Sequence, residues 1–180
     1  MKEVETAKDS IRIEFEADYL SEEARVAAEM TAIQKLADLA DYMKIYTDAS
    51  MDTLFREKAG EMIRGIFFTE DARLTLGATS NKKMKSITMG EFMKKGFGKD
   101  FIYTEVIFDS IRVMEPLQKS GELEYTGKLS ANQAIISYTD SDSVFSPSIP
   151  VTIEIISSRR IKIIGNDTLM VWAVLLGDMD

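Results

Sequence analysis

The stretch GELEYTGKLSANQAIISY at residues 121–138 decides the fold class. One set of alternate positions holds the apolar residues Leu123, Tyr125, Leu129, Ala131 and Ile135, and the intervening positions are mostly polar. This period of two is typical of a strand with one buried face. The alternation recurs in a predicted strand at 151–164, and long strands are also predicted at 101–114 and at 168–176. Because the last of these is apolar on both faces, it should be covered on both sides.

Helical periods occur only before residue 100. Ser21 is a candidate N-cap, with Glu22 and Glu23 in the first turn, for a helix over 21–46. A second helix is expected over 51–66, capped by Ser50, and a Thr88–Glu91 capping box starts a short third helix. The predicted apolar stripes are Val26, Met30, Ile33, Leu36, Ala37, Ala40 and Met43 in the first helix, and Leu54, Phe55, Met62, Ile63 and Ile66 in the second.

Helices segregated from long antiparallel strands indicate the α+β class. A short hairpin is expected between the second and third helices, at 72–76 and 83–87. The long strands suit a strongly curved sheet wrapped around the first helix. Residues 1–20 form an acidic N-terminal arm outside this pattern, and residues 21–180 are expected to form one domain.

The order of elements resembles the NTF2-like superfamily, as do the runs DASMDTLF at 48–55 and IFFTEDARLTL at 66–76. The resemblance covers about residues 21–178. It implies three N-terminal helices packed on a curved antiparallel sheet, with a pocket between the concave face and the helices. Because the superfamily holds enzymes, ligand binders and dimerising modules, the resemblance does not choose among these functions. It also makes a sheet-to-sheet homodimer an expected partner arrangement.

The chain has 180 residues and contains neither Cys nor His. This composition excludes Ser-His-Asp and Cys-His nucleophile systems, thiol redox chemistry and His-ligated metals, so neither a metal nor a cofactor is expected. The net charge of −8 argues against nucleic acid as a partner. No membrane span is expected, because the longest apolar run, 169–176, has eight residues against the roughly 20 that a spanning helix needs. The composition leaves the cellular compartment open.

Polar or aromatic residues that face inward are the candidate site residues, and five are expected to line a pocket for a small apolar ligand: Tyr46, Tyr103, Tyr125, Gln133 and Trp172. The alternative interpretation is an ordinary core in which these side chains find partners. A His-free isomerase, cyclase or hydrolase is a further alternative. It would pair a carboxylate (Asp48, Glu105 or Asp109) with Tyr46 or Tyr103.

Charge is distributed unevenly. Residues 1–23 hold eight acids against three bases, whereas residues 82–99 hold six lysines against Glu91 alone. Either segment could dock a protein partner, which would make the chain a structural component of a larger assembly. The last strand suggests another contact, because its outer face (Met170, Trp172, Val174 and Leu176, or the alternate positions) needs cover that a homodimer would supply. The sequence thus favours a non-catalytic ligand-binding or protein-interaction domain that forms homodimers.

Overall fold

The computed structural model describes residues 19–76, 85–95, 102–139, 142–164 and 167–180. The sheet follows the order β2-β1-β7-β6-β4-β3, with β5 paired to β4. The helices are α2 (Glu22–Thr47), α3 (Thr53–Ile66) and α4 (Met89–Lys95). The strands are β1 (Arg73–Leu76), β2 (Lys85–Thr88), β3 (Tyr103–Gly121), β4 (Glu124–Tyr138), β5 (Ser143–Phe145), β6 (Ile149–Ile164) and β7 (Asp167–Met179).

The long strands β3, β4, β6 and β7 pair antiparallel with one another in that order, as a meander. The short strand β1 meets β7 in parallel at Leu74 and Met179. Register shifts interrupt β3, the first between Asp109 and Arg112, and Ser110 there has a positive φ of 53°. Such bulges bend a strand and increase its twist. The predicted α+β class, with helices against a strongly curved antiparallel sheet, is confirmed.

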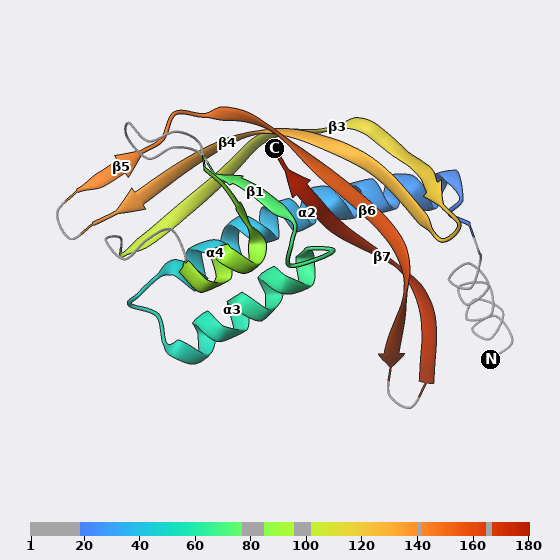
Figure 1. Ribbon diagram of the computed structural model, residues 1–180, viewed down its shortest axis with the longest axis horizontal. Coiled ribbons are helices and arrows are strands. Elements are labelled where there is room, and N and C mark those ends of the chain that lie inside the picture. The colour runs from blue at the N-terminus through green and yellow to red at the C-terminus, as the bar shows by residue number, and fades with distance from the viewer. Residues whose placement is uncertain (1–18, 77–84, 96–101, 140–141, 165–166) are drawn as a thin grey trace, which may run out of the picture.

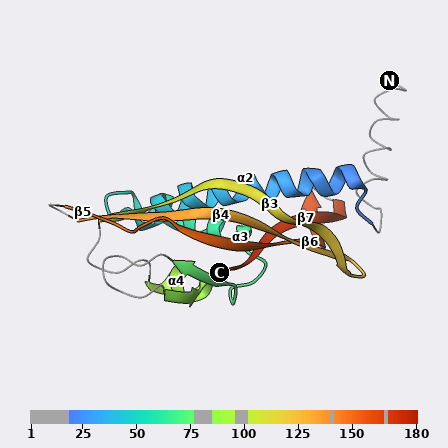
Figure 2. The ribbon, with the colours of Figure 1, turned by 90° about the horizontal axis from the view of Figure 1, so that it is seen from above.

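The long helix α2 runs along the sheet beside β3 (Figures 1 and 2). Ser21 caps it as predicted, because its hydroxyl accepts a hydrogen bond of 3.1 Å from the N–H of Ala24. In Figure 1, α3 lies beside the C-terminal half of α2, and α4 meets the end of α2 where the Tyr46 hydroxyl donates to the Met93 carbonyl. The Thr88–Glu91 capping box also forms, with reciprocal bonds of 3.1 and 3.3 Å. The cap of α3 was predicted wrongly, since Asp52 rather than Ser50 accepts from the N–H of Leu54.

Small residues form the N-terminal half of the buried face of α2. The buried set is Ala28, Ala32, Leu36, Leu39 and Met43. The predicted stripe is therefore wrong at Val26, Met30 and Ala37, which are exposed. In α3, Leu54, Phe55 and Met62 are likewise exposed, while Ile63 and Ile66 are buried with Ala59 and Gly60. Both errors arise because alanine and glycine, which carry little hydrophobic signal, occupy several of the buried positions.

The core fills the space between the helices and the middle of the concave sheet face. Fully buried side chains from both layers meet there, among them Leu36, Leu39, Met43, Phe92, Leu129, Ile135, Ile153, Ile155 and Leu176. Trp172 and Val174 of β7 pack against this core, so the outer face of that strand consists of the alternate positions, including Leu169, Val171 and Leu175. Among the described residues, no helix is both long and apolar enough to cross a membrane.

Beyond the body of the sheet, β6 and β7 continue as a two-stranded ribbon. The pairing of β4 with β6 ends at Ser158, whereas β6 and β7 stay paired from Arg159–Trp172 to Ile164–Asp167. This ribbon, residues 159–164 with 167–172, projects past the helices in Figure 1. Ile161 and Ile163 are exposed on it.

Candidate functional site

Two of the predicted site residues, Tyr125 and Trp172, lie together. Their rings meet edge to face, with centroids 5.5 Å apart and an interplanar angle of 77°. Tyr125 is buried on β4, and its phenol oxygen accepts a hydrogen bond of 3.2 Å from the N–H of Leu20. Trp172 comes from β7, at the base of the ribbon. This aromatic pair therefore joins the segment that precedes α2 to the middle of the sheet.

A surface hollow of about 330 Å³ lies beside this aromatic pair. Its walls are the start of α2 on one side and β6 and β7 on the other. The lining residues are Leu20, Ala24, Ala27, Ala28, Thr31, Ser157, Trp172 and Val174. We call it the N-terminal hollow. It exists because α2 presents only small side chains to the sheet here, so that the helix and β7 cannot close the space between them.

None of the lining residues of the N-terminal hollow is charged. Thr31 uses its hydroxyl within its own helix, donating a bond of 2.8 Å to the carbonyl of Ala27. Ser157 is fully buried, and its Oγ has no hydrogen-bond partner among the described residues. The hollow is thus a mostly apolar space that is lined by the aromatic ring of Trp172 and by Ser157, whose hydroxyl has no hydrogen-bond partner among the described residues.

Tyr46 and Gln133 lie elsewhere, in packed surroundings. The Tyr46 hydroxyl donates a 2.5 Å bond to the carbonyl of Met93, and its ring packs near Phe92. Gln133 is fully buried, and its Nε2 donates to the sulfur of Met179 at 3.4 Å. With a rise of 1.5 Å per residue, Tyr46 lies about 33 Å along α2 from Ala24 at the N-terminal hollow. The five predicted residues therefore do not form one pocket, and the side chain of Tyr103 lies outside what the structure describes.

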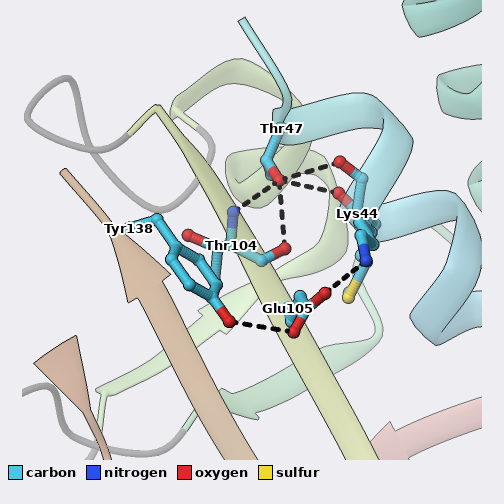
Figure 3. A network of polar contacts seen from close by, with 6 residues as sticks. Lys44, Thr47, Thr104, Glu105 and Tyr138 are labelled. Carbon is cyan, nitrogen blue, oxygen red and sulfur yellow. Dashed lines mark hydrogen bonds and ion pairs between the residues drawn. The ribbon is translucent and has the colours of Figure 1, made fainter. Parts of the chain in front are cut away.

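The carboxylates proposed for catalysis make contacts that hold the fold together. Glu105 pairs with Lys44 of α2 and accepts a 3.3 Å bond from the Tyr138 hydroxyl (Figure 3). Asp48 accepts from Ser50 in the turn after α2, and Asp109 accepts from the Asn132 amide at 3.1 Å. The tyrosine that accompanies Glu105 is thus Tyr138, which the sequence analysis did not single out.

Thr47 occupies the centre of the same network (Figure 3). Its Oγ1 accepts from the N–H of Thr104 at 3.1 Å and lies 3.2 Å from the Thr104 carbonyl. The buried Thr104 hydroxyl in turn lies 3.2 Å from the hydroxyl of Ser137. These contacts fasten the C-terminal end of α2 to the edge strand β3, which is a structural role.

A second hollow, of about 290 Å³, lies between α2 and α3. Polar residues of both helices line it, among them Gln34, Lys35, Asp38 and Glu61. Burial lowers the pKa of Lys35, and the nearby Asp38 carboxylate partly opposes that shift. No group of three or more acidic residues that could hold a metal ion occurs within the described ranges.

Sequence reasoning missed Ser157 and the alanines of α2 for different reasons. Ser157 continues the inward alternation of Val151, Ile153 and Ile155 on β6, so a polar residue in that register was a detectable signal. The alanines gave no such signal. Their small side chains leave the space of the hollow open, and an alanine in a sequence does not indicate whether the space beside it is empty.

Comparison with known proteins adds information on fold alone. No protein-family model matches the chain, and no curated protein matches it. A scytalone dehydratase-like protein from Novosphingobium aromaticivorans is similar in structure, with a TM-score of 0.39, 12% identity, and 87% of this chain and 89% of that chain covered. A type 2 hexachlorocyclohexane dehydrochlorinase, LinA, is similar with a TM-score of 0.39, 10% identity, and 86% and 90% covered.

Proposed function

We propose that this chain is a non-catalytic ligand-binding domain whose binding site is the N-terminal hollow. The observation that carries the proposal is an uncharged, half-open space of about 330 Å³ with Trp172 in its wall. Pockets for small molecules are concave and mostly apolar, with a few polar groups, and begin at about 300 Å³. The ligand that suits this space is a small, neutral, apolar molecule.

Two features support binding over catalysis. Glu105 already has Lys44 on one carboxylate oxygen and Tyr138 on the other, so both oxygens take part in contacts that hold the fold. The N-terminal hollow itself offers no carboxylate, lysine or arginine in its lining. The alternative, a His-free isomerase, cyclase or hydrolase, would pair Asp48, Glu105 or Asp109 with a tyrosine. If it used Glu105, the tyrosine that contacts this carboxylate is Tyr138.

A ligand titration tests the proposal directly, because Trp172 is the only tryptophan of the chain. Tetralin, a neutral two-ring hydrocarbon, serves as the probe, with tryptophan emission as the signal. We expect a saturable change for the wild type and its loss in Ala24→Leu, which fills the hollow. Ala37→Leu makes the same change at an exposed position of the same helix and should bind like the wild type. An unsaturable response, or equal binding by Ala24→Leu, would refute the assignment.

We also propose that two copies of the chain pair through the free edge of β7. In the part of the chain that the structure describes, no strand pairs with that edge between Thr168 and Leu175. No charged residue occurs from Thr168 to Gly177. A long, uncharged, apolar edge is a template for adding another strand, and native proteins usually cover one. A second copy offers the same uncharged strand, which can pair antiparallel about a two-fold axis.

Sedimentation velocity distinguishes this edge from other surfaces. The double variant Leu169→Lys with Val171→Lys should sediment as a monomer, because charges on an edge strand oppose pairing. Ile161→Lys places the same charge on the neighbouring strand of the ribbon and should remain a dimer. A wild-type monomer, or a dimer that survives the double substitution, would contradict edge pairing.

The remaining hypothesis, a component of a larger assembly, depends on residues 1–18, which lie outside the described residues, and on residues 82–99, of which the structure describes 85–95. The division into an arm at 1–20 and one domain from 21 to 180 also stays a prediction.

A further inference from the structure

We propose that Ser157 is the polar anchor of the N-terminal hollow, so that the ligand carries a single hydroxyl or carbonyl group on an otherwise apolar frame. This inference rests on the proposed function, and it adds the chemical class of the ligand.

The argument begins with the cost of burying an unpaired hydroxyl. Ser157 is fully buried, and its Oγ has no partner among the described residues. A buried hydroxyl without a hydrogen bond is unfavourable, and most buried polar atoms in proteins are paired. Ser157 also lines the N-terminal hollow, so a ligand there can supply the missing bond.

Two other buried serines have partners for their hydroxyls. Ser137 lies 3.2 Å from the Thr104 hydroxyl, and Ser146 accepts a bond of 2.9 Å from the N–H of Ile135. Ser158, the neighbour of Ser157, is buried and unpaired as well, but it lies on the opposite face of β6 and does not line the hollow. Ser157 is therefore distinguished by being both unpaired and beside a space that can hold a ligand.

The surroundings of Ser157 limit what the rest of the ligand can be. With no charged side chain in the lining, an ionised ligand would lose its hydration without gaining a counter-charge. An apolar cavity of about 150 Å³ holds benzene, so the volume here suits roughly two fused rings. Trp172 offers such rings an aromatic edge or face.

Two probes that differ by one hydroxyl test the anchor. Tetralin and 2-tetralol have the same two-ring frame, and both can be titrated against Trp172 fluorescence. The wild type should bind 2-tetralol roughly two- to tenfold more tightly, which is the net effect of one hydrogen bond. Ser157→Ala should abolish this preference and leave the affinity for tetralin unchanged.

Ser158→Ala is the matched control, because it removes a second buried, unpaired hydroxyl from the same strand and should keep the preference. Because Ser157→Ala removes a buried hydroxyl that has no partner, the melting temperature of this variant should not fall below that of the wild type. Circular dichroism checks that the variant is folded. Ser157→Thr retains a hydroxyl and should retain the preference.

If Ser157→Ala still favours 2-tetralol, or if the wild type binds both probes equally, Ser157 is not the polar anchor, although the hollow is still a binding site. If the wild type binds neither probe, the proposed function fails as well.

Discussion

Leu20 and Tyr125 are 105 residues apart in sequence, and the backbone N–H of Leu20 donates a 3.2 Å hydrogen bond to the Tyr125 hydroxyl. The bond is buried and lies where the chain enters α2. Since Leu20 lines the N-terminal hollow and Tyr125 supports Trp172, the bond holds opposite walls of the hollow at a fixed separation.

Tyr125→Phe should lower both stability and ligand affinity. It leaves the buried Leu20 N–H unpaired, which costs about 1 kcal/mol or more of unfolding free energy. Tyr46→Phe is the control, because it also removes one phenol hydrogen bond, to Met93, but at the far end of α2. Urea unfolding should show a loss for both variants, whereas tetralin titration should show weaker binding for Tyr125→Phe alone.

A pair of glycine substitutions should change stability in opposite directions. A Cβ on Gly127 would lie 2.7 Å from the Glu115 carbonyl oxygen, a backbone atom that cannot rotate away. Gly127→Ala should therefore cost about 1–3 kcal/mol, as overpacking does. Gly65 in α3 has no atom within 4 Å of that position, so Gly65→Ala should gain up to about 1 kcal/mol. Chemical denaturation measures both, and equal effects would contradict the close β3–β4 approach.

The contact between Asp178 and Arg73 should make stability depend on pH. The Asp178 carboxylate accepts bonds of 2.9 Å from the Arg73 N–H and 2.7 Å from its guanidinium. The backbone bond, followed by the side-chain bond and charge, holds the Asp178 pKa below its usual value. A lowered folded-state pKa stabilises the fold above the unfolded pKa, near 4, and this stabilisation is lost as the pH falls through the lowered value.

Asp178→Asn should accordingly be less stable than the wild type at pH 7, and the gap should close as the pH drops below about 4. Asp71→Asn, an exposed change in the turn before β1, is the control and should match the wild type throughout. A gap that stays constant with pH would show that the carboxylate charge does not contribute.

Thr47→Val should weaken the attachment of α2 to β3. The substitution removes the acceptor for the N–H of Thr104, a fully buried residue, and should cost about 1–3 kcal/mol. Lys44→Met removes an exposed ion pair from the same network and should change stability by under about 1 kcal/mol. If the two variants lose equal stability, the threonine contacts are not what fastens the helix.

The fold class could be predicted from the sequence because the helical and strand repeats of apolar residues are clearest where large side chains pack in the core. Strand alternation at 121–138 and the capping box at Thr88 correspond to β4 and α4. The strand β6 corresponds to the predicted strand at 151–164, and the serines and arginines at 157–160, between its two apolar runs, continue the ladder. Hydrogen bonding along a ladder depends on backbone groups, so polar residues do not interrupt it.

The site was harder to predict than the fold. Tyr125 and Trp172 were identified as candidates, yet their meeting depends on the pairing of β4, β6 and β7, which no local pattern specifies. Tyr46 and Gln133 were candidates on the same grounds as Tyr125 and Trp172, but they lie in packed surroundings where other side chains and backbone groups contact them. The N-terminal hollow depends on alanines at 24, 27 and 28, and a period of apolar residues cannot distinguish a tightly packed alanine from one beside an open space.

The ribbon of β6 and β7 gives this fold a segment that can open independently of the core. At its base the Arg159 N–H donates to the Leu123 carbonyl and the Arg160 guanidinium reaches the Phe68 carbonyl. Beyond these contacts, its strands pair only with each other among the described residues. Segments with few buried contacts open at a small fraction of the global unfolding free energy. Amides at 159–164 should therefore exchange their hydrogens long before those of Leu129 or Ile153. Because Trp172 lies at the base of the ribbon, such an opening would end beside the N-terminal hollow and leave the core closed.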